Sequence, residues 1–176
     1  MPEIEIVNVV ATADIEQQVD LVEISKLPDI IYSTEKYGGR VAYLKTPSIK
    51  GKVSIFRTGK LISVGTKSEE QALQDLNNTV KFLVSKGSIK PVNIEAEVRN
   101  IVAVQNLGST VALEEMSLAM NCIYEPEQFS GLIIRQDNPK VTYLVFSSGK
   151  VVITGSKSLE EVDKAALKLQ EIIDNI

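Results

Sequence analysis

Several short segments of the chain alternate apolar and polar residues with a period of two, which is typical of half-buried β-strands. Residues 7–13 and 98–104 are also strand-like, and each is followed by a short amphipathic segment, at 19–25 and 111–119. Four short segments rich in Val, Ile, Tyr and Thr then follow each one, separated by Pro and Gly-Lys turns. The pattern predicts strands and short helices that lead into antiparallel meanders.

Two longer segments instead carry apolar residues three and four positions apart, which predicts amphipathic helices. Gln71 follows Ser68 and Glu161 follows Ser158 at the spacing of a capping box, which marks a helix start. The expected apolar stripes are Leu73, Leu76, Val80 and Leu83 in one helix, and Val162, Ala166, Leu169 and Ile173 in the other. A helix that covers one face of a sheet leaves the other face open.

These segments form one unit that occurs twice. Val53–Ser68 aligns with Tyr143–Ser158 without a gap, with Phe, Gly-Lys, Gly and Lys-Ser at identical spacing. Upstream matches are Asn8–Ala11 with Asn100–Ala103, Ile31-Tyr32 with Ile123-Tyr124, Gly39 with Gly131, and Pro47 with Pro139. The alignment shifts by two residues before Phe56, which places a longer turn at Ser48–Lys52 in the first repeat. We predict an α+β protein of two repeats, residues 1–90 and 91–176.

Composition excludes several chemistries. The 176 residues include no histidine and only Cys122 as cysteine, so histidine-based triads, histidine- or thiolate-bound metals and internal disulfides are excluded. The chain has no Gly-rich phosphate loop, and its apolar runs are far shorter than the roughly 18 residues that span a bilayer. The acidic Met1–Glu5 does not resemble a signal peptide. We expect no enzyme, cofactor, metal or membrane partner.

A net charge of −4 argues against nucleic-acid binding unless the charges are segregated between two faces. Strand parity places Lys150, Val152 and Thr154 on one face, and Val151 and Ile153 on the face that meets the helix. The open face would then be apolar with a cationic border, which suits a DNA minor groove. The residues expected at this border, against phosphates, are Lys60, Lys67, Arg135, Lys140, Lys150 and Lys157.

Each of these signals has an ordinary explanation when taken alone. A strand Asn is usually satisfied locally, a strand Phe usually belongs to the core, and Gly-Lys between strands is first of all a turn. Their duplication in one register makes the functional interpretation specific.

Tyr124–Arg135 and Phe146–Ser158 resemble the second repeat of TATA-box-binding proteins, and the resemblance extends over almost the whole chain. It implies a pseudo-twofold saddle with a ten-stranded antiparallel sheet and helices on the convex face. It also implies an archaeal general transcription initiation factor in the cytoplasm, associated with the nucleoid. Such a factor binds and bends A·T-rich double-stranded promoter DNA, then recruits transcription factor B and, indirectly, RNA polymerase.

The resemblance also assigns roles to individual residues. The aromatic wedges that enter base steps are Tyr37, Phe56, Phe129 and Phe146. The residues at the bases and the groove floor are Asn8, Val10, Ile62, Val64, Asn100, Val102, Val152 and Thr154. The acidic loop that receives transcription factor B contains Glu125, Glu127 and Gln128.

The first repeat departs from the family pattern at several positions. Tyr37 replaces a Phe wedge, Tyr43 stands where we expect the phosphate-binding Arg, and Val64 replaces a Thr. Ser54 and, in the second repeat, Ser130 are further departures. A diverged protein-interaction module with weak or lost DNA binding is therefore the alternative function. An accessory domain of a ribonuclease or glycosylase is a third.

Overall fold

The computed structural model describes residues 3–176, and its elements follow the order of two repeats. The elements of the first half are β1 (Ile4–Asp14), α1 (Leu21–Ile24), β2 (Ile30–Tyr32), the 3-10 helix η1 (Tyr37–Gly39), β3 (Val41–Leu44), β4 (Lys52–Phe56), β5 (Lys60–Thr66) and α2 (Glu69–Ser85). Those of the second half are β6 (Glu97–Asn106), α3 (Leu113–Ala119), β7 (Leu132–Asp137), β8 (Lys140–Val145), β9 (Lys150–Ser156) and α4 (Leu159–Asp174).

Neighbouring strands are hydrogen-bonded in the order β2-β3-β4-β5-β1-β6-β9-β8-β7. Consecutive strands of each meander pair antiparallel, as predicted. The sheet has nine strands within residues 3–176 where ten were expected, because Cys122–Tyr124, the counterpart of β2, is not a strand. The chain divides into two compact units, residues 8–99 and residues 100–176 with the N-terminal residues up to 7.

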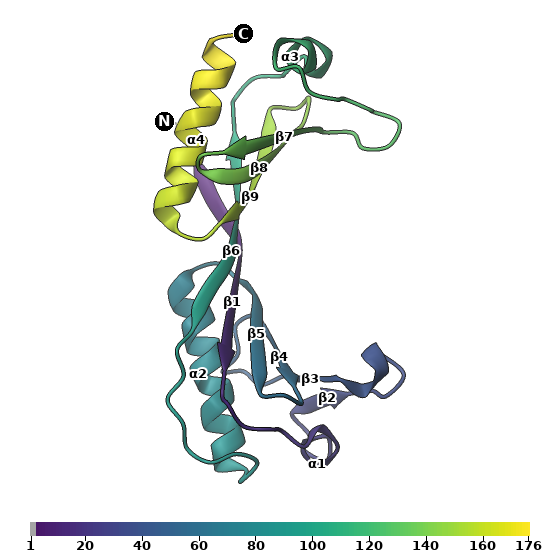
Figure 1. The fold of residues 1–176 in the computed structure, drawn as a ribbon, viewed down its shortest axis with the longest axis vertical. Coiled ribbons are helices and arrows are strands. Elements are labelled where there is room, and N and C mark those ends of the chain that lie inside the picture. Colours follow the sequence, from purple (N-terminus) through teal and green to yellow (C-terminus); the bar gives the residue numbers. More distant parts are fainter. Residues whose placement is uncertain (1–2) are drawn as a thin grey trace. The chain divides into compact units, whose positions relative to one another are not determined.

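In the unit of residues 8–99, α2 packs on β5 and β4 (Figure 1). Leu76, Val80 and Leu83 are buried as the spacing predicts, but Leu73 is exposed and Ala72 takes its place in the interface. The buried carboxylate of Asp75 accepts hydrogen bonds from the backbone N–H groups of Lys50 and Gly51, both at 2.8 Å. Asp75 therefore links α2 to the turn between β3 and β4.

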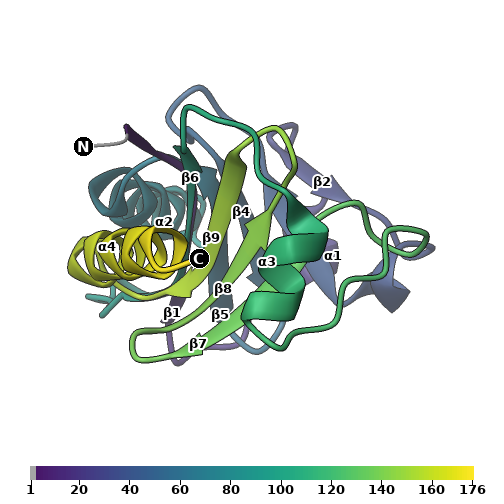
Figure 2. The ribbon, with the colours of Figure 1, turned by 90° about the horizontal axis from the view of Figure 1, so that it is seen from above.

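In the other unit, α4 lies against β9 (Figure 2). Val162, Ala166 and Leu169 of the predicted stripe are buried. The hydroxyl of the fully buried Tyr143 donates a hydrogen bond to the carbonyl oxygen of Ala165 at 2.8 Å. Helix and sheet are thus joined in both units, but through different polar contacts.

Both long helices begin at the predicted capping serines. Ser68 Oγ accepts from the Gln71 N–H at 3.1 Å, and Ser158 Oγ accepts from the Glu161 N–H at 3.2 Å. These bonds satisfy N–H groups that a helix start leaves without an internal partner. None of the helices within residues 3–176 combines the length and the apolarity needed to cross a lipid bilayer.

Candidate nucleic-acid interface

In each repeat, the face of the sheet that lies away from the long helix is only partly covered. In β5 and β9 every second residue is buried, including Leu61, Val151 and Ile153, while the residues between them remain accessible. Because side chains alternate across a strand, the accessible residues share the face opposite the helix. This surface, called the open face below, comprises Asn8, Val10, Ser54, Phe56, Ile62 and Val64 in the first repeat and Asn100, Val102, Leu144, Phe146, Val152 and Thr154 in the second.

The two asparagines are held in the same way. Asn8 Oδ1 accepts a hydrogen bond from the Gly65 N–H at 2.7 Å, and Asn100 Oδ1 accepts from the Gly155 N–H at 2.8 Å. Gly65 and Gly155 have positive φ angles, of 85° and 103°, which residues with a side chain rarely adopt. With each amide oxygen engaged, the Nδ2 donors remain for a ligand that presents acceptors.

The neighbours of the asparagines differ between the repeats. Asn100 Nδ2 lies 3.4 Å from Thr154 Oγ1, so amide and hydroxyl form one polar group. The first repeat has Val64 at the position of Thr154, and a valine side chain has no hydrogen-bonding group. The polar part of the open face is therefore larger in the second repeat.

Phe129 and Phe146 form a ring pair in the second repeat. Their ring centroids lie 5.8 Å apart with planes at 65°, an edge-to-face contact, and Phe129 is still 37% exposed. Gly131 makes this contact possible, since a Cβ there would lie 2.8 Å from Phe129 Cε1 and 3.1 Å from Phe146 Cε1. Such distances are shorter than carbon–carbon contacts in packed proteins. A larger residue at 131 would force the rings to move.

Tyr37 and Phe56 form no such pair; within residues 3–176 the Phe129–Phe146 contact has no counterpart in the first repeat. Tyr37 is 69% exposed and has a φ of +55°, which is rare for a residue with a side chain. It associates with Tyr43 instead. Burial and, next, a hydrogen bond with Tyr37 raise the pKa of the Tyr43 hydroxyl. In the first repeat Phe56 and Tyr43, which lies opposite Ser54, share the open face, and the ring of Tyr37 lines a cavity with Tyr43.

The strand register corrects the alignment of the two repeats. Tyr43 lies opposite Ser54 in the β3–β4 pair, whereas Ile133 lies opposite Leu144 in β7–β8. Since Ser54 and Leu144 are counterparts, Tyr43 corresponds to Ile133 and not to Arg135. The counterpart of Arg135 is Lys45, so the expectation that Tyr43 replaces a phosphate-binding Arg is wrong.

The strand register also changes where the first repeat has its two-residue insertion relative to the second. Leu44 pairs with Val53 and Ile134 with Tyr143, so the β3–β4 and β7–β8 connections have equal length. The predicted longer turn at Ser48–Lys52 is wrong, and the two additional residues lie before β3, within residues 33–40. The matching prolines Pro47 and Pro139 suggested the wrong gap because both turns contain one.

The predicted cationic residues lie along the border of the strands. Lys60 and Lys150 begin β5 and β9, Lys140 begins β8, and all three are exposed and share the parity of the open face. Arg135 lies opposite Thr142 on that face. Lys67 and Lys157 stand directly before the helix caps, where their backbone N–H groups bond to Gln71 and Glu161.

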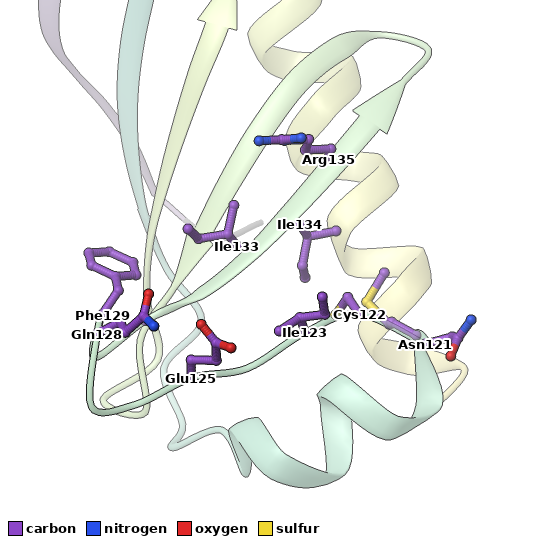
Figure 3. Close-up of a pocket in the computed structure, with 11 residues that line it drawn as sticks. Asn121, Cys122, Ile123, Glu125, Gln128, Phe129, Ile133, Ile134 and Arg135 are labelled. Atoms are coloured by element: carbon purple, nitrogen blue, oxygen red, sulfur yellow. The ribbon is translucent and has the colours of Figure 1, made fainter.

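The predicted acidic loop borders a cavity of about 570 Å³ (Figure 3). Glu125 and Gln128 line it from the loop, and Ile133 lines it from β7. Glu127 is exposed in the same loop, whose turn is closed by N–H bonds from Gln128 and Phe129 to the Glu125 carbonyl oxygen, both at 3.0 Å. The cavity occupies the edge of β7 that a strand at Cys122–Tyr124 would have covered.

The chain matches the family described as "Transcription factor TFIID (or TATA-binding protein, TBP)" over residues 3–85 and 95–176. The chain belongs to the TATA-binding protein family. The TATA-box-binding protein of Methanocaldococcus jannaschii is 40% identical over 177 residues, covering 99% of this chain and 96% of that one. The one from Cenarchaeum symbiosum is 36% identical over 171 residues, covering 97% and 93%.

A solved structure, "Methanococcus jannaschii TBP", matches the fold with a TM-score of 0.87 at 37% identity, and the match covers 99% of this chain and 100% of that one. The α+β fold with an antiparallel sheet and helices is therefore confirmed as that of the TATA-binding protein family. The archaeal relatives also agree with the archaeal type that the resemblance implied.

Several site residues escaped the sequence analysis although they belong to this family member's open face or its border. Gly131 lies beside the rings of Phe129 and Phe146, and Val41 lies opposite Phe56, whereas the sequence alignment had paired Gly131 with Gly39. Lys52 Nζ lies 3.7 Å from the Tyr43 ring centroid, and Arg99 Nε donates to Thr12 Oγ1 at 2.9 Å. The alternation of β4 contained the signal for Lys52, which shares the parity of Ser54 and Phe56.

Proposed function

We propose that this protein is a general transcription initiation factor that binds and bends the minor groove of TATA-like promoter DNA, then recruits transcription factor B and RNA polymerase. The observation that carries the proposal is the accessible ring pair of Phe129 and Phe146, on a largely apolar face that also presents the amide groups of Asn8 and Asn100. Monomeric soluble proteins seldom leave such a surface uncovered without a partner.

The open face fits the chemistry of an A·T-rich minor groove. The floor of that groove offers adenine N3 and thymine O2 as acceptors, and the Nδ2 groups of Asn8 and Asn100 are donors. Val10, Val102, Ile62 and Val152 offer apolar contact to the groove floor. Guanine would place its N2 amino donor against these groups, where neither the valines nor the amide donors could accept it. Selectivity for A·T pairs follows from this mismatch.

The rings supply the bending in this proposal. Apolar side chains that enter a minor groove unstack base steps and kink the duplex toward the major groove, and TATA-binding proteins are the standing example of this mechanism. Each unstacked step costs about a few kcal/mol, a general figure that is offset when the bent DNA meets more protein surface. Phe129, Phe146 and Phe56 would be the phenyl wedges, with Tyr37 the fourth candidate ring.

Phosphate contacts would come from the cationic border. A lysine that neutralises one phosphate releases about one counterion, so each contact adds roughly one unit to the slope of log affinity against log salt. Lys60, Lys140, Lys150 and Arg135 have the parity for this role, and Lys67 and Lys157 extend the border beside the helix starts. The net charge of −4 is compatible with DNA binding because part of the acidic charge belongs to the first turns of α2 and α4, which cover the face opposite the open face.

The acidic loop would be the contact for transcription factor B. Glu125, Glu127 and Gln128 are exposed next to apolar residues of the cavity edge, including Ile123 and Ile133. Charged groups around an apolar centre are typical of protein docking sites.

The second candidate function is a protein-interaction module with weak DNA binding, and the displaced ring of Tyr37 favours it. Fluorescence anisotropy with a labelled A·T duplex and a G·C-substituted duplex separates the two functions. A transcription initiation factor binds the A·T duplex preferentially, and added transcription factor B increases the anisotropy further. Equal, weak binding to both duplexes at low salt would contradict the proposal and support the interaction module.

A further inference from the structure

The two repeats differ at the residue that lies opposite the wedge, which is Phe56 at the end of β4 in the first repeat and Phe146 directly after β8 in the second. Val41 pairs with Phe56 across β3 and β4, and one step beyond the Leu132–Val145 pair the same register places Gly131 opposite Phe146. The glycine leaves room for a second ring beside Phe146, whereas the valine fills the corresponding space beside Phe56.

We infer that Val41 limits the first repeat to one wedge, so that the protein unstacks DNA strongly at the base step met by the second repeat and only weakly at the step met by the first. This inference rests on the proposed function and deepens it, because it makes Val41 and Gly131 the positioning residues that set the kink at each end of the element.

Space is the first argument. Even a single Cβ at position 131 would approach Phe129 Cε1 and Phe146 Cε1 to 2.8 and 3.1 Å, so any side chain there would displace the rings from their present contact. Val41 carries three side-chain carbons at the matching position and is only 8% exposed, so these carbons occupy the packed layer beside Phe56. A ring cannot enter space that is already filled at protein packing density.

The position of Tyr37 is the second argument. Tyr37 lines a cavity of about 200 Å³ together with Val41, Tyr43 and Lys52, and Lys52 Nζ lies 3.7 Å from the centroid of the Tyr43 ring. The second repeat has Ile133 at the position of Tyr43 and cannot offer a hydroxyl partner. In the first repeat Val41 therefore stands between Phe56 and the cavity that holds the Tyr37 ring.

The ring contact also prepares the second repeat for opening a base step. The edge-to-face contact holds Phe129 and Phe146 together before DNA arrives, so little side-chain freedom is lost when both enter one base step. Phe56 would have to open its step alone, and Tyr37 would have to release Tyr43 and desolvate its hydroxyl before it could assist.

A self-complementary A·T duplex with 2-aminopurine at the outer step of both ends tests this inference, since both binding orientations then give the same complex. Time-resolved fluorescence counts stacked and unstacked probes. We expect one unstacked probe per complex with the wild-type protein. Gly131→Ala should leave none, and Val41→Gly with Tyr43→Ile, which installs the residues of the second repeat, should give two. Two unstacked probes in the wild type, or none, would overturn the inference.

A readout without DNA keeps the test sharp if a variant folds poorly. In the free wild-type protein, NMR should show ring-to-ring cross-relaxation between Phe129 and Phe146, its loss in Gly131→Ala, and none between Tyr37 and Phe56. Cross-relaxation between Tyr37 and Phe56 would overturn the inference. Failure to bind the duplex would overturn the proposed function as well, whereas binding with two unstacked probes contradicts the inference alone.

Discussion

The two repeats share their pattern of buried residues and differ in the contacts that the buried and open faces make. β5 and β9 have identical burial from Lys60 and Lys150 onward, yet a carboxylate, Asp75, ties helix to sheet in one repeat and a phenol, Tyr143, does so in the other. The open faces diverge in the same way, because among the described residues 3–176 the ring pair is found in the second repeat. Duplication has thus preserved the layers, while single side chains decide what each copy can bind.

The largest expected effect is the loss of DNA binding in Phe146→Ala. Without this ring the second repeat loses its wedge pair, and affinity for an A·T duplex should fall by roughly two orders of magnitude, the equivalent of about 3 kcal/mol. Phe56→Ala is the matched variant and should cost less, because Phe56 has no partner ring. Anisotropy titrations measure both, and equal losses would erase the difference between the repeats.

Asp75→Ala should destabilise the fold by about 3 kcal/mol, since two backbone N–H groups lose a charged acceptor in a buried place. Urea unfolding followed by circular dichroism measures the change. Asp75→Asn is the control and should lose less, because the amide keeps one acceptor oxygen. A loss below about 1 kcal/mol in Asp75→Ala would show that the turn between β3 and β4 does not depend on α2.

Tyr143 makes stability sensitive to alkali. Burial raises the pKa of Tyr143 from 10.0 to about 12, so the unfolded chain loses this proton at lower pH than the folded protein. The contribution of Tyr143 is complete below pH 10 and is lost as the pH rises from 10 towards 12.

Tyr143→Phe should weaken this alkaline decline and cost about 1 kcal/mol at neutral pH through the lost hydrogen bond to Ala165. Urea titrations between neutral and alkaline pH measure both effects. An unchanged decline would assign the alkaline sensitivity to the other tyrosines. The first repeat has Val53 at this position and offers no equivalent group.

The smallest expected effect is that of Lys150→Ala, which should weaken binding to every sequence alike and lower the salt slope by about one unit. Lys60→Ala, the matched variant in the first repeat, should do the same if both repeats grip phosphates equally. Titrations at several salt concentrations provide the slopes. A slope unchanged by Lys150→Ala would remove Lys150 from the phosphate contacts.

Local chemistry made much of the fold predictable from the sequence. Alternation identified the strands and their faces, and the capping serines Ser68 and Ser158 marked both long helices, because these features depend on residues a few positions apart. The duplicated pattern also pointed to the open face and its two asparagines.

What the sequence could not provide depends on contacts between strands. That Tyr43 corresponds to Ile133 and not to Arg135 is visible only in the pairing of the strands. The segment Cys122–Tyr124 is as apolar as a strand, although the structure does not form one there. The roles of Val41 and Gly131 needed the positions of the rings themselves. Leu73 was misplaced because a helical stripe is wide enough to include residues at its border.

The most direct test of the central claim is resonance energy transfer between the ends of a labelled duplex that carries a TATA-like element. Bending by the open face predicts that transfer rises when the protein is added, and that it stays flat with a G·C-substituted duplex or with Phe146→Ala. No rise on the A·T duplex, even at low salt and with transcription factor B present, would contradict minor-groove bending as the function of this protein.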